Sequence, residues 1–287
     1  MNQRSGFIPI YVFLLFVCVG CGSAAPTVLE PAESVENLPP TASETLPPIV
    51  TSEPTVASAA PLAALPAEPQ EIHFKASDGT PLEGYYYPAA VNPAPLVVLM
   101  HWPNGNLHDW NEIAVWLQNR GLTNPFENPL NEAWWDESWF PEMQADVSYG
   151  VLIFNFRGSG ENAVDEPEID PGGWLDDAQS AMLVARSLEG VDSEHIFSIG
   201  SAHGGDGAID GCLYLNQQFP GSCAGTLALS PGSYLTLDYP ETVQTLGEIS
   251  PNTRVGCIGM ELEISICEYA ASLGNPMFEY HSIPGMF

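Results

Sequence analysis

Six continuous apolar runs alternate with longer amphipathic segments, and this alternation strongly constrains the fold. The runs read PLVVLMH, YGVLIFNF, HIFSIG, GTLALS, RVGCIGM and MFEYHSI. Strands that are apolar at successive positions are typical of parallel sheets, whose two faces are both covered by helices. The sequence therefore predicts an α/β fold with a mostly parallel sheet and helices on both faces.

Two more strands and four helices complete the expected pattern. The segments EIHFKAS and LEGYYYPA flank SDGTP, which is typical of an antiparallel hairpin and brings the total to eight strands. Helices are expected over 107–120, 174–189, 203–218 and 264–273. In the second of these, Asp176 and Asp177 are expected in the first turn, where the helix dipole favours carboxylates.

The N-terminus predicts export. Arg4 precedes an apolar run over 7–19 that is short for a membrane span, as in a signal peptide. The run ends in VCVGCGS, which resembles a bacterial lipobox, although Cys18 stands where leucine is usual. We expect a signal peptide over 1–21, lipidation of Cys21 and anchoring to the membrane of the bacterial cell envelope. The alternatives are an ordinary secretory signal or a retained anchor helix.

Residues 22–70 are rich in Pro, Ala, Ser, Thr and Glu, a composition that cannot bury enough apolar surface to fold. This segment is predicted to be a disordered tether that carries the folded domain, residues 71–287. Export permits disulfides, and four cysteines form two close pairs in sequence. We expect Cys212–Cys223 and Cys257–Cys267 bridges, with free buried cysteines as the alternative.

The charge of the chain limits its partners. Thirty-six acidic and six basic residues give a formal net charge of −30, so nucleic acids would be repelled and are not expected as partners. His101, His108 and His203 form no i, i+4 pair, and no Cys-x-x-Cys spacing occurs after the predicted signal peptide, so no metal is predicted. No cofactor is expected either.

An aromatic insertion is expected at about 121–148. It contains a cluster of Trp134, Trp135, Trp139 and Phe140 in a connection that would otherwise be short. These rings either cap a pocket or pack the insertion onto the domain.

The segment IFSIGSAHGGDGA places a glycine-rich turn between an apolar run and a predicted helix. Gly200, Ala202 and Gly204 have the spacing of the G-x-S-x-G turn, the nucleophile elbow, in which a strand delivers a serine nucleophile. The residues two before and two after the centre must be small, and glycines occupy both positions. Ala202 is therefore the expected centre. Ser201 is the less favoured alternative nucleophile, because it would place large side chains at the small positions.

In the order of these motifs, residues 71–287 resemble an α/β-hydrolase, and they are most similar to the dienelactone-hydrolase-like and acyl-esterase branches. The resemblance implies an eight-stranded, mostly parallel sheet with helices on both faces. The matching segments are SDGTPLEGYY, VVLMHWPNGN, NFRGSGEN, WLDDAQSA, SIGSAHGGDGA and ALSPGSY.

The resemblance also implies where the catalytic groups would lie. The nucleophile position is occupied by Ala202, and the oxyanion-hole amides are the backbone N–H groups of His203 and Trp102. The acid would follow the seventh strand, at Glu263 or alternatively Glu261. Either glutamate could instead be a helix-start carboxylate favoured by the dipole.

The catalytic histidine of these relatives follows the eighth strand, where this sequence reaches Phe287. His281 falls inside the predicted strand and is interpreted as a strand residue. The domain is thus expected to be truncated after its last strand, with the catalytic histidine missing.

Three functional hypotheses follow, because alanine cannot attack a carbonyl and loss of a triad member costs roughly 10^4 to 10^6 in rate. The first is an exported, membrane-tethered relative of carboxylic ester hydrolases that is inactive as written. The second is a non-catalytic pseudoenzyme lipoprotein that binds a small acyl-ester or aromatic ligand. The third is a truncated active hydrolase whose natural chain continues.

Overall fold

The computed structural model describes residues 63–127, 140–160, 169–261 and 263–284, all within one compact unit. The predicted signal peptide, Cys21 and most of the predicted tether lie outside the described residues, as do Trp134, Trp135 and Trp139. None of the described helices is long and apolar enough to cross a membrane.

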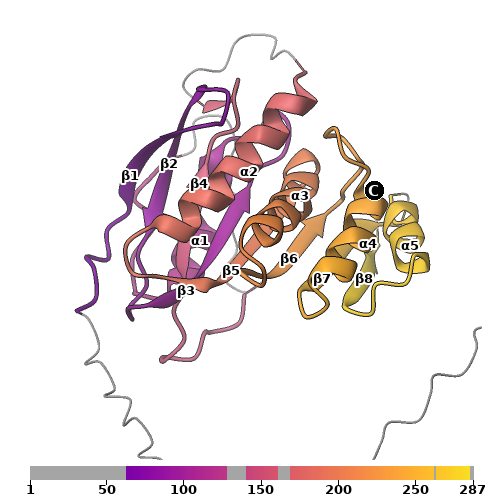
Figure 1. Ribbon diagram of the computed structural model, residues 1–287. Helices are drawn as coiled ribbons and strands as arrows, with labels where there is room; N and C mark the ends of the chain where they lie inside the picture. The colour runs from indigo at the N-terminus through magenta and orange to yellow at the C-terminus, as the bar shows by residue number, and fades with distance from the viewer. Residues whose placement is uncertain (1–62, 128–139, 161–168, 262, 285–287) are drawn as a thin grey trace, which may run out of the picture. The chain divides into compact units, whose positions relative to one another are not determined.

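One eight-stranded sheet organises the domain, in the order β1-β2-β4-β3-β5-β6-β7-β8 (Figure 1). β1 and β2 form the predicted hairpin, β2 also pairs antiparallel with β4, and all later neighbours are parallel. The predicted sheet is therefore confirmed. The strands are β1 (Gln70–Lys75), β2 (Pro81–Tyr87), β3 (Ala94–Met100), β4 (Gly150–Phe154), β5 (Val191–Ser201), β6 (Cys223–Leu229), β7 (Arg254–Met260) and β8 (Phe278–Ile283).

The order of the strands determines where a site can form. The chain leaves β3 toward β4 on one side and leaves β5 toward β6 on the other, so the two connections diverge above neighbouring strands. Such a switch point opens a crevice at the carboxyl ends of parallel strands. Residues that follow β3 and β5 are thereby brought together.

The four predicted helices are present, α3 with the predicted bounds and the others with shifted bounds. The first is a short 3-10 turn, η1 (Leu107–Trp110), followed by α1 (Asn111–Gln118). The others are α2 (Pro171–Ser187), α3 (His203–Gln218) and α5 (Ser265–Ser272).

The expectation that Asp176 and Asp177 lie in the first turn of α2 is wrong. The side chain of Asp170 caps the helix by accepting from the Gly173 N–H, and Pro171 begins it, so the helix starts earlier than expected. The two aspartates therefore lie beyond the first turn, where they bind Arg157 instead.

The sequence analysis missed α4 (Tyr239–Ile249). Its signal resembles that of α2, since Asp238 accepts from the Glu241 N–H and a proline follows within the first two helical positions. Val243 and Leu246 supply the buried face of this short helix.

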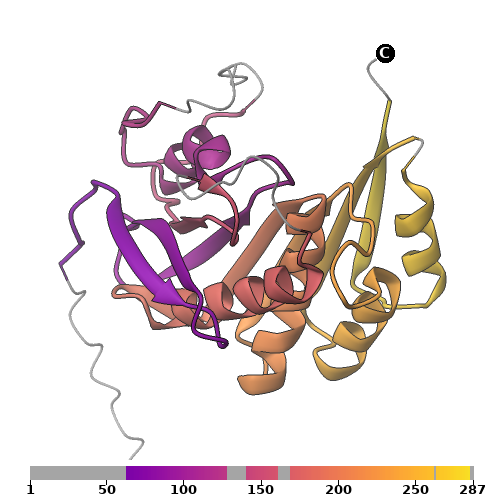
Figure 2. The same cartoon turned by 90° about the horizontal axis from the view of Figure 1, so that it is seen from above.

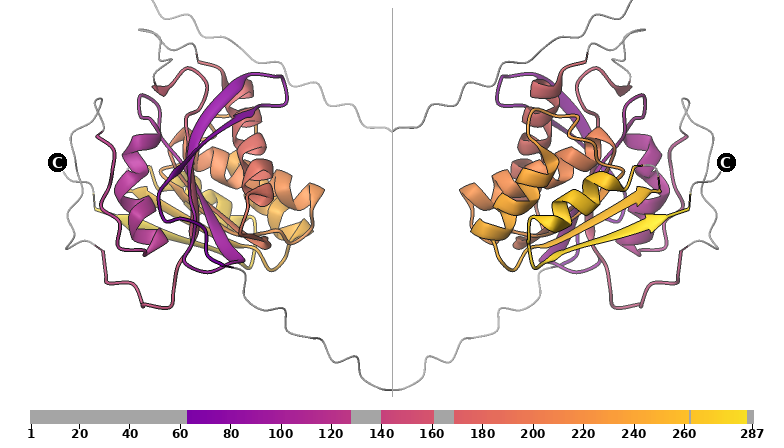
Figure 3. Two further views of the ribbon diagram at one scale, coloured as in Figure 1. Left: turned by 90° about the vertical axis from the view of Figure 1, so that its left-hand side faces the viewer. Right: turned by 90° about the vertical axis from the view of Figure 1, so that its right-hand side faces the viewer.

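The helices cover the two faces of the sheet unequally (Figures 2 and 3). α1 packs with Leu107 and Trp110 against one face, over Val97, Leu99 and Ile153. α2, α3, α4 and α5 pack on the other face, in a larger buried cluster.

The packed chain begins before β1, within the segment predicted as tether. The Leu65 carbonyl accepts from Arg120 at 2.8 Å, and the Ala67 carbonyl accepts from Gln118 at 2.8 Å. The last residues of the predicted tether therefore lie against the domain.

Both predicted disulfides are present. Cys212–Cys223 joins α3 to the first residue of β6, and Cys257–Cys267 joins β7 to α5. All four cysteines are fully buried. The bridges therefore link α3, the helix that follows the predicted elbow, and α5 covalently to the sheet. We call α3 the elbow helix.

Candidate functional site: an elbow centred on alanine

The turn between β5 and α3 is centred on Ala202. This residue has φ 51° and ψ −119°, a left-handed conformation that costs an alanine free energy. Its N–H donates to the Leu229 carbonyl at 2.8 Å, and its own carbonyl accepts from Gly205 at 2.8 Å. The strained conformation is thus held by β6 on one side and by the first turn of α3 on the other.

The glycines around Ala202 are required by close backbone contacts. A Cβ at Gly200 would lie 1.9 Å from the Gly204 carbonyl oxygen, and one at Gly204 would lie 2.4 Å from the carbonyl oxygens of Met100 and His101. Neither position can take a side chain without moving the backbone. The small-residue requirement therefore centres the turn on Ala202 and leaves Ser201 as the last residue of β5.

The backbone amides of Trp102 and His203 lie at neighbouring strand ends, after β3 and β5. Within the described loops and turns, neither amide donates to a backbone carbonyl. The predicted oxyanion hole would use these two amides, because an amide at a helix N-terminus and a loop amide at a switch point can bind a carbonyl or carboxylate oxygen.

Two buried histidines lie beside the elbow. The His101 Nε2 accepts from the Phe156 N–H at 3.1 Å, and its Nδ1 lies 2.9 Å from the Trp102 carbonyl, so Nδ1 carries the proton. His203 stacks on Trp174 with ring centroids 4.8 Å apart and lies edge-on to His101 at 5.7 Å. Neither ring nitrogen of His203 has a hydrogen-bond partner among the described residues.

Burial keeps both imidazoles neutral. It lowers the pKa of His101 to about 4 and that of His203 to about 3, the latter with a contribution from His101. A neutral imidazole held against aromatic rings positions the backbone around it. These two histidines therefore have a packing role beside the elbow, through Phe156, Trp102 and Trp174.

The predicted acid candidates follow β7. Glu261 and Glu263 are both exposed, and the Glu263 N–H donates to the Met260 carbonyl at 2.8 Å. Burial, followed by the charges of Glu263 and Asp206, raises the pKa of Tyr234. Tyr234 thus lies near both the acid position and the elbow helix. His281 lies in β8 and is exposed, as a strand residue.

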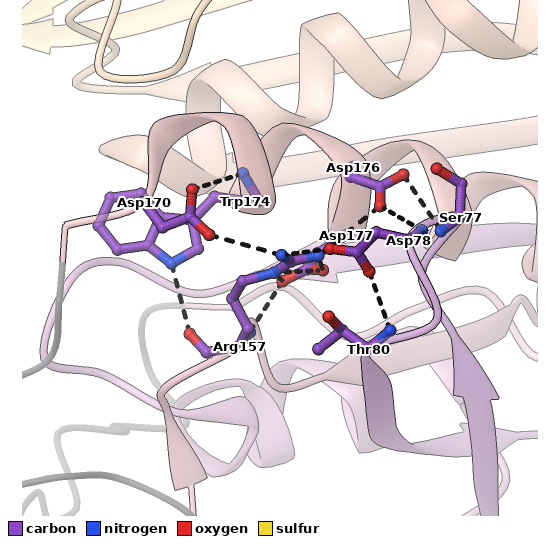
Figure 4. A network of polar contacts seen from close by, with 9 residues as sticks. Ser77, Asp78, Thr80, Arg157, Asp170, Trp174, Asp176 and Asp177 are labelled. Carbon is purple, nitrogen blue, oxygen red and sulfur yellow. Dashed lines mark hydrogen bonds and ion pairs between the residues drawn. The ribbon is translucent and has the colours of Figure 1, made fainter.

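The sequence analysis missed a cluster of aspartates around Arg157, which follows β4 (Figure 4). The guanidinium donates to Asp177 through Nη2 at 2.8 Å and Nε at 3.0 Å, and to Asp78 through Nη1 at 2.7 Å. Asp170 and Asp176 are ion-paired at 3.4 and 3.6 Å. One cation therefore fastens the β1–β2 turn to α2.

This cluster also supports the elbow. Trp174 donates from Nε1 to the Arg157 carbonyl at 3.4 Å and stacks on His203, the first residue of α3. Arg157 is only 16% exposed at its side chain, and Asp177 is fully buried. The only sequence signal for this arrangement was the arginine itself, one of six basic residues in an acidic chain.

A cavity of about 450 Å³ lies beside β2, at the carboxyl end of β4. Its lining includes Glu71, Glu83, Tyr85 and Asn155, while Ala202 and His203 do not line it. Phe140, the described member of the aromatic insertion, contacts the Trp116 ring at 5.1 Å instead. The cavity and the elbow are thus separate features of the described residues.

Comparisons of sequence identify distant relatives. No protein-family model matches the chain. The uncharacterized protein YfhR of Escherichia coli (strain K12) is 27% identical over 145 residues, which is 50% of this chain and 42% of the relative. YfhR of Salmonella typhimurium (strain LT2) is 30% identical over 148 residues, 50% of this chain and 40% of the relative. The chain therefore spans less than half the length of the curated relatives it matches.

Comparisons of structure identify hydrolases. The alpha/beta hydrolase GrgF from Penicillium sp. sh18 gives a TM-score of 0.56 at 13% identity, over 76% of this chain and 90% of that chain. DcsB, solved with a substrate analogue, gives 0.52 at 13% identity over 76% and 90%. A 2,6-dihydroxy-pseudo-oxynicotine hydrolase gives 0.51 at 13% identity over 77% and 62%. Together with the strand order and the elbow, these likenesses show that the chain has the α/β-hydrolase fold.

Proposed function

We propose that this chain is a non-hydrolytic member of the dienelactone-hydrolase-like and esterase-like branch, tethered to the cell envelope through a lipid on Cys21, and that it binds a carbonyl or carboxylate ligand at the elbow. The observation that carries the proposal is Ala202 at φ 51°, ψ −119° in the elbow position. A methyl group stands where a hydrolase presents its hydroxyl, while the amides of His203 and Trp102 need no particular side chain.

The neighbouring residues support loss of chemistry. Ser201 belongs to β5, opposite Leu229, rather than to the apex of the turn. His101 uses both ring nitrogens for backbone partners, and burial lowers the pKa of His203 to about 3. Neither imidazole is arranged as a general base, which needs a pKa near the working pH and a free nitrogen toward its proton donor.

Hydrolysis of a short-chain nitrophenyl ester tests the proposal. We expect the full chain to show no turnover above a Ser201→Ala control and no labelling by a serine-reactive fluorophosphonate. Ala202→Ser alone should restore little activity, since loss of one triad member already removes roughly 10^4 to 10^6 of the rate. Circular dichroism establishes that each variant is folded.

Turnover at ordinary enzyme rates, abolished by Ser201→Ala, would reject the assignment of the elbow centre. Binding is measured separately, by saturation-transfer NMR with phenyl acetate and benzoate as probes. If neither probe binds the folded chain, the ligand-binding part of the proposal fails even where the chemical part holds.

A further inference from the structure

α3, the helix that follows the elbow, carries another acidic cluster, which has no ion-paired cation among the described residues. Asp206 and Asp210 lie one helical turn apart on α3, and each is only 1% exposed. Residues four apart share one face of a helix, so the two carboxyls face the same neighbours. Those neighbours are α4 and the loop of residues 230–238 that follows β6.

Asp206 binds this loop through backbone amides. Its carboxylate accepts from the Gly232 N–H at 3.1 Å and from the Tyr234 N–H. It also lies in the first turn of α3, where the helix dipole favours negative charge. Ser230 and Ser233 have φ of 48° and 55°, so the loop curls around the carboxylate in a conformation unusual for residues other than glycine.

Asp210 has no such compensation. Neither of its oxygens accepts a hydrogen bond of full geometry from the described residues, and the Thr242 side chain of α4 lowers its pKa by less than burial raises it. The buried Tyr239 hydroxyl is likewise unpaired among the described residues. A buried carboxylate without a partner is strongly unfavourable, so such a group takes up a proton.

The titration of these groups agrees with their geometry. Burial and then the charge of Asp206 raise the pKa of Asp210 to about 8, and burial raises that of Asp206 to about 6. Burial, with both aspartates, raises the pKa of Tyr239. Tyr234 of the loop lies near Asp206 and also near Glu263 of the segment after β7, and the described titratable groups that act on the pair include no cation.

We propose that Asp210 holds a proton at neutral pH, and that its neutral form lets the charged Asp206 keep the 230–238 loop and α4 packed on the elbow helix, as a proton-dependent latch. Tyr234 of the loop lies near both Asp206 and Glu263, so the latch holds the loop between the elbow helix and the segment after β7. Loss of the proton places two charges in one buried space and releases the loop. This latch does not depend on whether the elbow hydrolyses esters.

The sign of the pH dependence follows from the raised pKa values. The folded state binds the proton more tightly than the unfolded state, so its stabilising effect is full below the unfolded pKa of about 4. It is lost as pH rises through about 8, the folded pKa of Asp210. Between these two pKa values, the titration of Asp210 lowers the folding equilibrium constant by up to roughly tenfold for each unit of rising pH.

Asp210→Asn tests the latch in the full chain, because asparagine has the shape of the protonated acid without its titration. We expect the ratio of the folding constants, variant over unmodified chain, to rise by on the order of tenfold per pH unit between about pH 5 and pH 8. Urea unfolding at each pH measures it. The matched control is Asp146→Asn, which removes one charge from an exposed residue and should give a nearly constant ratio.

A ratio for Asp210→Asn that does not change with pH, or that follows the Asp146→Asn control, overturns the proposal. If the variant fails to fold, carbon NMR of labelled aspartate carboxyls in the unmodified full chain decides. An aspartate that titrates near pH 8 supports the latch, and titration of every aspartate below about pH 5 refutes it.

Discussion

The two aspartate clusters of this domain lie on the two flanks of α3, and they are neutralised by different means. On the α2 side, four aspartates surround the guanidinium of Arg157. On the α4 side, Asp206 accepts from backbone amides, Asp210 lacks that compensation, and no cation is among the described groups that face them. In a chain with six basic residues, most buried carboxylates must be satisfied without a salt bridge.

The difference teaches that residue type alone does not predict how a carboxylate behaves. The hydrogen bond from Arg157 lowers the pKa of Asp78 to about 2, whereas burial raises the pKa of Asp210 to about 8. Hydrogen bonds to Asp177 and Asp78 raise the pKa of Arg157 against the effect of its burial, so the guanidinium stays charged. Asp78 therefore contributes less stability in acid and Asp210 contributes less in base, while burial also raises the pKa of Asp177 within the Arg157 cluster.

The largest effect in this comparison is expected from Arg157→Met. The change removes the cation and leaves the fully buried Asp177 without it, which costs about 3–5 kcal/mol of the free energy of unfolding. Urea unfolding at neutral pH measures the loss. Arg186→Met is the control: its ion partner Glu194 is 60% exposed, so that pair contributes about 1 kcal/mol or less. The variant also loses a hydrogen bond to Ser222 and a contact over the Phe219 ring, a smaller total loss than at Arg157. Equal losses in the two variants would show that Arg157 is not the centre of its cluster.

The second effect concerns the amide-bound carboxylate. Asp206→Asn presents an amide NH2 or a weaker carbonyl acceptor to the Gly232 and Tyr234 N–H groups, so we expect a loss of about 1–3 kcal/mol. Equilibrium unfolding near pH 7 gives the value, because the pKa of Asp206 is raised to about 6 and its carboxyl is charged at pH 7. A gain in stability at that pH would mean that the loop amides do not depend on the charge of Asp206.

A smaller effect separates capping from ion pairing. Asp170 and Asp238 cap α2 and α4 in the same way, but only Asp170 also contacts Arg157. Each change to alanine should cost about 1 kcal/mol for the lost cap. The difference between the two measures the added ion pair, which we expect to be below about 1 kcal/mol because Asp170 is 47% exposed. Thermal unfolding of the two variants measures this difference. A larger value would show that the Arg157–Asp170 ion pair is stronger than the exposure of Asp170 suggests.

The smallest effect is the acid response of Asp78. Its pKa is lowered to about 2, so its contribution is present above the unfolded value of about 4 and is lost as pH falls through about 2. Asp78→Asn should therefore lower the melting temperature slightly near pH 6 and not at all near pH 2. This profile is opposite in direction to that of Asp210→Asn, and profiles of the same sign would break the comparison.

Much of the site could be predicted from local sequence, because its demands are local. Gly200 and Gly204 exclude a Cβ by backbone contacts within a few residues, so their spacing already locates Ala202 at the centre of the turn. The strands were equally readable, since burial on both faces requires continuous apolar runs. α4 was also readable from the sequence, since Asp238 and Pro240 mark a helix start and Val243 and Leu246 lie three residues apart on its buried face.

By itself, the sequence determined the α/β alternation, the elbow and the cysteine pairs, since each depends on spacing along the chain. Only the tertiary structure decided which aspartates meet Arg157 and which meet backbone amides. Asp78 and Asp177 come from segments nearly a hundred residues apart. They meet at the guanidinium of Arg157, which follows β4 and lies between the β1–β2 turn and α2. The charge state of a carboxyl depends on burial and on neighbours from other elements, and no local pattern contains either.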